Sequence, residues 1–251
     1  MAQTKQQVAI ITGGGTGIGL ATARMLAKKG WGVAITGRRE AKLAEAARQI
    51  EKASFAPVLI VAADVSDRKQ AAGVVDAALL RFGRVDAVIN AAGAAELADI
   101  DQSSGEVLDR ILGVNTIAPA AIIARAWTEF KKQESGCVVN ISSWATHDPF
   151  PGFFAYAASK AAVNLMARSC AVEGREIGVR GFAVAPGAVE TDMLRSAFDE
   201  TMIPTSACLS PDEVASVVVA CIEGQHDREN GKTIYMRRGE SGSVEMFASP
   251  A

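Results

Sequence analysis

The sequence lacks several features that mark particular protein classes. It has only four cysteines in 251 residues, Cys137, Cys170, Cys208 and Cys221, at spacings that fit neither a zinc site nor a C-x-x-C redox pair. We therefore expect buried thiols that act as small apolar side chains, and no metal site. The formal charge is only −2 and lysine and arginine form no run. This balance argues against nucleic acid or an anionic membrane as a partner.

A leader peptide and a long apolar run are also missing. The first residues, Met-Ala-Gln-Thr-Lys-Gln-Gln, have no apolar core of the signal-peptide kind. We find no apolar run of the roughly twenty residues that a membrane span needs. The protein is therefore expected in the reducing cytoplasm, away from membranes. The content of 49% hydrophobic and 22% charged residues is that of an ordinary globular domain.

Short apolar segments alternate with amphipathic ones along most of the chain. This alternation predicts strands at residues 8–12, 32–36, 57–62, 85–90, 137–141, 179–185 and 233–236. It predicts helices near 17–29, 40–53, 67–82, 114–131 and 154–176, and one from residue 211. The strands show no polar alternation, so both faces of the sheet should be buried. We expect one α/β domain over residues 1–251, a Rossmann-type doubly wound parallel sheet with helices on both faces.

A glycine-rich turn joins the first strand to the first helix, Thr12-Gly13-Gly14-Gly15-Thr16-Gly17-Ile18-Gly19. Glycine tolerates positive φ and lets a ligand approach the backbone closely. The helix N-terminus offers free N–H groups and partial positive charge to a pyrophosphate. The strand–turn–helix setting favours a dinucleotide site over a glycine-rich turn without a ligand.

The end of the second strand bears on the choice of dinucleotide. An acidic residue there would favour the free ribose hydroxyl of NAD. This chain has Gly37 followed by Arg38 and Arg39, and a guanidinium pairs well with the 2′-phosphate of NADP. We therefore predict NADP, with NAD less favoured, although both arginines could be solvated residues that open the next helix. Asp64, after the third strand, could contact the adenine amino group or cap the following helix.

Tyr156 and Lys160 lie four residues apart in a predicted helix and so share one face. An ammonium beside a phenol lowers the pKa of the phenol, which makes the pair a usable proton donor and acceptor. The pair alone could equally be an aromatic ring packed beside a surface lysine. Ser143 follows a strand and could hydrogen-bond a substrate oxygen. Asn115 lies early in an apolar helix, where an amide is unusual. It could have a role in the site, or it could be a structural amide bonded to the backbone.

Four separated motifs make the chain resemble the short-chain dehydrogenase/reductase family over nearly its whole length. Residues 12–19 fit T-G-x-x-x-G-x-G, and Asn90-Ala91-Ala92-Gly93 resembles N-N-A-G with Ala91 in place of the second asparagine. Tyr156 and Lys160 fit Y-x-x-x-K, with Ser143 thirteen residues before the tyrosine. Pro186-Gly187 and Thr191 resemble the segment that contacts the nicotinamide carboxamide.

The resemblance implies hydride transfer between a nicotinamide and a carbonyl or secondary alcohol. Tyr156 would exchange the proton, Ser143 would polarise the carbonyl, and Lys160 would bind the nicotinamide ribose. Asn115 would hold a water in a proton relay. The residues implied in cofactor binding are Gly13, Thr16, Gly17, Ile18, Gly19, Arg38, Arg39, Asp64, Val65, Asn90, Ala91, Gly93, Tyr156, Lys160, Pro186, Gly187, Val189 and Thr191.

The loop at residues 144–154 leaves the Ser143 strand and enters the Tyr156 helix, so it should line the substrate pocket. Its aromatic residues indicate an apolar or ring-containing small molecule, although its phenylalanines could instead pack at a subunit interface. Residues 188–209 should form a lid. The predicted substrate contacts are Ser143, Trp144, Phe150, Phe153, Tyr156 and Met193.

Two departures from the family pattern stand out. Thr16 occupies a position where NADP-preferring relatives often carry a basic residue, and the usual V-D-G-G ending is absent.

Two other functions stay open. One is a catalytically silent NADP-binding sensor or scaffold, and the other is epimerisation or dehydration on the same fold. The complete set of Ser143, Tyr156 and Lys160 disfavours the sensor. The resemblance also suggests a homotetramer or homodimer built on the helices near 114–131 and 154–176, whose apolar character fits burial between subunits.

Overall fold

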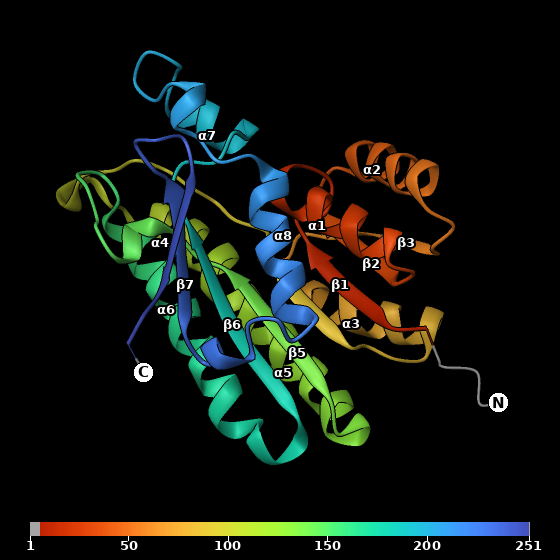
Figure 1. Cartoon of the computed structure of the whole chain (residues 1–251). Coiled ribbons are helices and arrows are strands. Elements are labelled where there is room, and N and C mark those ends of the chain that lie inside the picture. The colour runs from red at the N-terminus through yellow and green to blue at the C-terminus, as the bar shows by residue number, and fades with distance from the viewer. Residues whose placement is uncertain (1–5, 251) are drawn as a thin grey trace.

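The computed structural model describes residues 6–250, and within them one sheet runs through the centre of the molecule (Figure 1). Its strands lie in the order β3-β2-β1-β4-β5-β6-β7-β8. All neighbours pair in parallel except β8, which is antiparallel to β7. The strands are β1 Val8–Thr12, β2 Gly32–Gly37, β3 Val58–Ala62, β4 Ala87–Asn90, β5 Gly136–Ile141, β6 Val179–Pro186, β7 Thr233–Arg238 and β8 Val244–Ala248.

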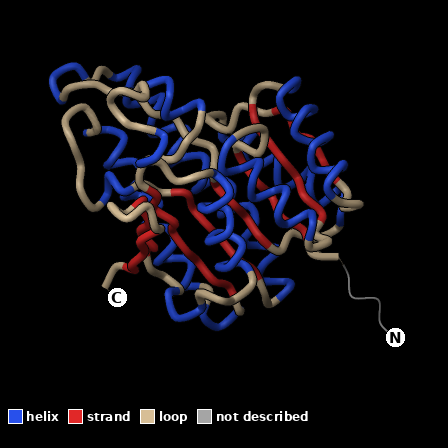
Figure 2. Tube along the Cα trace, turned by 45° about the horizontal axis from the view of Figure 1, so that its top comes forward, coloured by secondary structure: helices blue, strands red, loops and turns tan. Residues whose placement is uncertain are grey.

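Helices cover both faces of the sheet (Figure 2). Buried side chains of α1, α2 and α8 pack on one face, and those of α3, α5 and α6 on the other. Short helix α4 packs on α6, and α7 lies in the segment between β6 and α8. The helices are α1 Gly17–Lys28, α2 Glu40–Ala53, α3 Arg68–Phe82, α4 Gly105–Leu112, α5 Ala118–Gln133, α6 Phe154–Glu173, α7 Asp192–Ala197 and α8 Pro211–Ile222. The doubly wound fold predicted from the alternation of segments is confirmed.

The central strands are apolar on both faces because helices cover both. Every residue of β1 and of β5 is buried. Polar side chains cap the N-termini of two of the surrounding helices, α3 and α8. Asp67 accepts from the backbone N–H groups at Lys69 and Gln70 to cap α3, and Ser210 forms a capping box with Glu213 at α8.

Strand order reverses between β1 and β4, where the chain crosses from one half of the sheet to the other. Ligands of such sheets bind in the crevice at the carboxyl ends of the strands at this reversal. The ends of β1, β4, β5 and β6 meet at this edge and carry the glycine-rich turn, Asn90, Ser143 and Pro186.

The α-helices α4 and α7 and the strand β8 were not predicted. Strand β8 makes the sheet end in an antiparallel pair, which the prediction of a parallel sheet did not include. The chain reverses at Gly239–Ser243, where the Gly239 N–H donates to the Ser243 carbonyl and Gly242 adopts φ +78°. Such a tight hairpin needs no helical crossover.

The predicted helix at 114–131 is part of a longer helical stretch. It begins with α4, widens into a π-helical turn at Gly113–Ile117 and continues as α5. By length and composition alone, Gly105–Gln133 could cross a membrane, because an 18-residue window within it has a mean hydropathy of 1.5. One side of this stretch belongs to the core, where Ile122 and Phe130 are buried, and Arg125 pairs with Asp76 of α3; a third of the apolar window is buried. The apolar helix from residue 114 was predicted from the sequence, whereas α4 ahead of it was not.

Candidate active site

The glycine-rich turn brings bare backbone to the start of α1. Gly13 has φ +66°, and a Cβ there would lie 2.9 Å from the Ala92 backbone nitrogen. Thr16 is the N-cap of α1 but makes no side-chain capping bond, and the first turn holds no acidic residue. The N–H groups at this helix start are therefore left to an outside acceptor. This fits the diphosphate of a dinucleotide.

The Asn90–Gly93 turn packs directly against this loop. The Thr12 hydroxyl oxygen accepts from the backbone N–H groups of Ala91 (3.0 Å) and Ala92 (2.9 Å). The Asn90 amide donates to the Asn140 side chain at 2.9 Å, which ties β4 to β5. Sequence reasoning did not assign these holding roles to Thr12 and Asn140, because the contacts join residues far apart in the chain.

Gly93 lies between the glycine-rich turn, expected to bind the cofactor, and Lys160, expected to take part in catalysis. A Cβ on Gly93 would lie 3.4 Å from Met193 Cε, 3.6 Å from Asn115 Oδ1 and 3.7 Å from Lys160 Nζ. The missing side chain leaves a cradle between these three groups. A Cβ at Gly93 would be in van der Waals contact with all three groups, so any larger side chain would fill this cradle.

Arg38 and Arg39 directly follow β2 and are exposed, and Arg39 is the N-cap of α2. Neither side chain forms an ion pair with another described residue. Asp64 Oδ1 accepts from the Ser66 N–H (3.0 Å) and the Ser66 hydroxyl (2.8 Å). Asp64 is thus engaged in the turn before α3, while Asp67 caps that helix. The adenine contact of Asp64 and of buried Val65 stays a prediction.

Tyr156 and Lys160 share the inner face of α6, next to the end of β5. The buried Lys160 ammonium donates to the Ile141 carbonyl at 2.8 Å, and it lies 5.7 Å from the centroid of the Tyr156 ring. Ser142, beside Ser143, donates to the Lys160 carbonyl at 3.3 Å. The structure therefore brings Ser143, Tyr156 and Lys160 together from β5 and α6, and the reading of Lys160 as a surface lysine is wrong.

The pKa values of the pair differ from the sequence expectation. Burial raises the pKa of Tyr156 above its usual value, and the neighbouring Ser143 hydroxyl acts in the opposite direction through a hydrogen bond. Burial also lowers the pKa of Lys160 to about 8. The expected lowering of the Tyr156 pKa by Lys160 was wrong for this structure, because burial is the largest cause of the shift and the Lys160 ammonium is held by the Ile141 carbonyl. At neutral pH the phenol keeps its proton.

We expect the buried Lys160 ammonium to lower the free energy of unfolding near neutral pH. The folded-state pKa of about 8 lies below the ordinary 10.5, so the cost is full below about pH 8 and disappears as the pH rises toward 10.5. We expect Lys160→Met to raise the free energy of unfolding at pH 7 by about 1–3 kcal/mol while turnover is lost. Thermal unfolding from pH 7 to 10 measures this, with Lys52→Met as an exposed control. A destabilised variant at pH 7 would contradict the prediction.

Asn115 lies in the π-helical turn and is 1% exposed. Its carbonyl oxygen accepts from the Ala94 N–H at 2.8 Å, and its amide donates to the Ala94 carbonyl and the Ser159 hydroxyl, both at 2.9 Å. The amide is thus a structural one that fastens the segment after Gly93 to α6. Holding a water stays a prediction, and a π turn is a frequent feature of functional sites.

The segment after β6 reaches back to the glycine-rich turn. The Gly187 N–H donates to the Met236 carbonyl at 2.8 Å, and Val189 forms a bridge with Leu209. Thr191 caps α7, and its methyl carbon would lie 3.2 Å from a Cβ on Gly17. Pro186 ends β6. The predicted carboxamide-binding segment therefore lies beside the dinucleotide loop.

The aromatic residues of the loop after Ser143 lie in two clusters, one beside Tyr156 and one against β7 and β8. The Phe150 and Phe153 rings pack at a tilt with centroids 4.1 Å apart, and Phe198 from the segment after α7 lies 6.0 Å from Phe150. Phe153 lies 4.8 Å from the Tyr156 ring, so this cluster forms an apolar wall beside Tyr156. Trp144 packs against rings from β7 and β8, and its predicted contact with the substrate stays a prediction.

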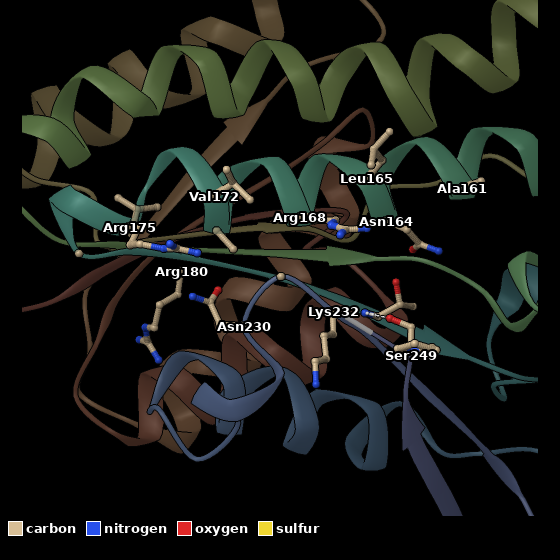
Figure 3. A pocket seen from close by; sticks show the side chains of 16 residues that line it. Ala161, Asn164, Leu165, Arg168, Val172, Arg175, Arg180, Asn230, Lys232 and Ser249 are labelled. Carbon is tan, nitrogen blue, oxygen red and sulfur yellow. Dashed lines mark hydrogen bonds between the residues drawn. The ribbon is translucent and has the colours of Figure 1, made fainter.

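A separate groove of about 650 Å³ runs along the outer face of α6, and Tyr156 does not line it (Figure 3). Exposed Leu165 and Val172 of α6 lie on one side with Arg168, and Arg175 follows just after the end of this helix. Lys232, just before β7, lines the opposite side. This groove belongs to the outside of the subunit.

Comparison with known proteins gives consistent results. A family model described as short chain dehydrogenase matches residues 7–201. The chain is 32% identical over 245 residues to 3beta-hydroxysteroid dehydrogenase 1 of Eggerthella lenta, spanning 94% of each chain. It is 34% identical over 204 residues to cyclopentanol dehydrogenase of Comamonas testosteroni, spanning 79% of each.

Solved structures show the same likeness. A levodione reductase superposes with a TM-score of 0.86 at 27% identity, covering 94% of this chain and 98% of the other. A 3-ketoacyl-(acyl-carrier-protein) reductase from Brucella melitensis, complexed with NADH, has a TM-score of 0.85 at 29% identity, with the same coverage.

Proposed function

Because the chain belongs to the short-chain dehydrogenase/reductase family, we propose that it is an NADP-dependent oxidoreductase of apolar, ring-containing ketones or secondary alcohols. The family acts on alcohol and carbonyl groups with a nicotinamide cofactor. The observation that carries the proposal is the meeting of Ser143, Tyr156 and Lys160 beside the glycine-rich turn and the Gly93 cradle.

The nicotinamide, when bound, supplies or takes up the hydride. In the direction of reduction, Tyr156 gives its phenolic proton to the substrate oxygen, and its raised pKa keeps that proton available at neutral pH. The Ser143 hydroxyl holds the same oxygen for protonation. Lys160, held by the Ile141 carbonyl, binds the ribose and keeps positive charge near the phenol.

The preference for NADP rests on Arg38 and Arg39 at the exposed end of β2. Because the related reductase was solved with NADH, NAD is the competing outcome. We expect Arg38→Ala to weaken NADPH binding about tenfold or more and to leave NADH binding nearly unchanged, since a charge-assisted bond to the 2′-phosphate is lost. Titration of both nucleotides measures this. The control is Arg48→Ala, the same change on the exposed face of α2. Equal weakening of both nucleotides would refute the NADP assignment.

The substrate class rests on the wall of Phe150, Phe153 and Phe198 beside Tyr156. Two relatives are named for ring-shaped alcohols, a hydroxysteroid and cyclopentanol. Nicotinamide absorbance against matched cyclic and short charged ketones tests the proposal. Turnover of the charged ketones in preference to the cyclic ones would reject it.

We also propose that the subunit associates with further copies as a homotetramer or homodimer. The outer face of α6 exposes Leu165 (63%) and Val172 (61%), more apolar surface than a solvated helix usually carries. Sedimentation velocity distinguishes these assemblies from a stable monomer, which would contradict the proposal.

A further inference from the structure

Four aromatic rings from three segments form a closed cluster at the edge of the sheet. Trp144 and His147 come from the loop after Ser143, Tyr235 from β7 and Phe247 from β8. All six ring pairs have centroids between 5.1 and 5.9 Å apart. Phe247 and Tyr235 face each other across the strand pair and stack at 22°. The cluster therefore fixes the loop after Ser143 to the last strand.

Hydrogen bonds continue from this cluster to Ser143 itself. The Thr146 hydroxyl donates to the Ser143 carbonyl at 2.9 Å and accepts from the Asn164 amide at 3.0 Å. Since its one proton is used, the Tyr235 hydroxyl 3.1 Å away is the donor in their contact. The Ser143 hydroxyl oxygen accepts from the Ala145 N–H at 3.2 Å. The orientation of Ser143 thus depends on a loop that is held from β7.

Strand β8 supplies the outer side of this support. Phe247 contacts both rings of the loop, at 5.6 Å from Trp144 and 5.4 Å from His147. Glu245 of β8 accepts from Arg237 Nε at 2.9 Å, and the Arg237 guanidinium lies 5.0 Å from the centroid of the Trp144 ring. Met246, between Glu245 and Phe247, opposes Met236 and points to the other face of the sheet.

We propose that Phe247 is a positioning residue for Ser143, acting through Trp144 and His147 on the loop that carries the serine. The inference rests on the proposed oxidoreductase function. In this proposal Trp144 transmits the packing of Phe247 to the loop, and β8 thereby affects the position of Ser143. A misplacement of a reacting group by about 1 Å can cost 10²-fold in rate, so a small shift of this loop would be measurable.

The test compares Phe247→Ala with Met246→Ala. The two side chains are adjacent and almost equally exposed, 43% and 47%, but lie on opposite faces of β8. We expect Phe247→Ala to lower kcat about tenfold or more, with nucleotide affinity and Tm close to those of Met246→Ala. Phe247→Trp, which keeps a ring, should restore most of kcat. A fall in kcat equal in both alanine variants, or no fall in Phe247→Ala, would overturn the proposal.

A pH profile separates positioning from a merely structural effect. The Ser143 hydroxyl lowers the pKa of Tyr156, so a displaced serine should move the half-maximal pH for alcohol oxidation upward in Phe247→Ala alone. An unchanged profile in that variant would count against positioning.

Amide hydrogen exchange provides a test that does not depend on turnover. The N–H groups of Ala145, Thr146 and His147 bond within the loop and should exchange faster in Phe247→Ala than in Met246→Ala. Equal exchange would overturn the positioning role. A wild-type protein that turns over no alcohol or ketone would refute the proposed function instead, and exchange would still decide whether Phe247 holds the loop.

Discussion

Replacing Tyr156 with phenylalanine should lower kcat by about 10²–10⁴-fold, the usual contribution of a positioned acid or base. The change removes one hydroxyl and leaves the ring that packs against Phe153. Because Lys160 is held by the Ile141 carbonyl and not by the phenol, the nucleotide site should stay intact. Steady-state rates with the best ketone of the panel measure the loss, and titration of NADPH checks that binding survives.

The same experiment decides between an enzyme and a sensor. A wild-type protein that binds NADPH firmly but reduces nothing on a broad panel of aldehydes, ketones and quinones would favour the silent sensor or scaffold. Full turnover by Tyr156→Phe would show that the Tyr156 hydroxyl is not the proton donor. The expected pattern is a wild-type enzyme with turnover and a variant that still binds nucleotide with nearly unchanged affinity.

Gly19→Ala should abolish nucleotide binding, with an affinity loss of at least about 100-fold, and should lower the free energy of unfolding by about 1–3 kcal/mol. A Cβ at this position would lie 2.7 Å from the Gly13 carbonyl carbon and closer still to its oxygen. These are backbone atoms, so the clash cannot be relieved by a side-chain rotation. The turn must move, and with it the N–H groups at the start of α1.

Gly73→Ala is the matched control for this change. Gly73 lies within α3, and a Cβ there would meet nothing within 4 Å. Since alanine is the better helix former, this variant should be more stable by up to about 1 kcal/mol, with unchanged nucleotide affinity. Calorimetry and NADPH titration of both variants test the pair. A Gly19→Ala protein with wild-type affinity would show that the turn does not need its present shape.

Local motifs were readable from the sequence because each depends on residues in one turn or one helix face. The glycine-rich turn has its required strand and helix on either side. Tyr156 and Lys160 share a face of α6 because a helix repeats every 3.6 residues. The alternation of apolar strands and amphipathic helices predicted the doubly wound sheet. The order of its strands and the antiparallel pairing of β8 came only from the fold.

The Asn115 amide shows a limit of such reasoning. A polar residue in an apolar helix signals a role, but the sequence left catalysis and structure open. Its three hydrogen bonds to Ala94 and Ser159 show that the side chain has a structural role, while its part in holding a water stays a prediction. Those partners come from a loop and from another helix, so no local pattern could identify them.

The amino-acid order by itself determined the family, the parallel sheet and the position of the reacting groups on their elements. Only the tertiary structure decided that the pKa of Tyr156 is raised, that Trp144 packs under Phe247 and that β8 supports the serine loop. The physical reason is that burial and ring packing depend on segments distant in sequence, whereas turns and helix faces depend on near neighbours.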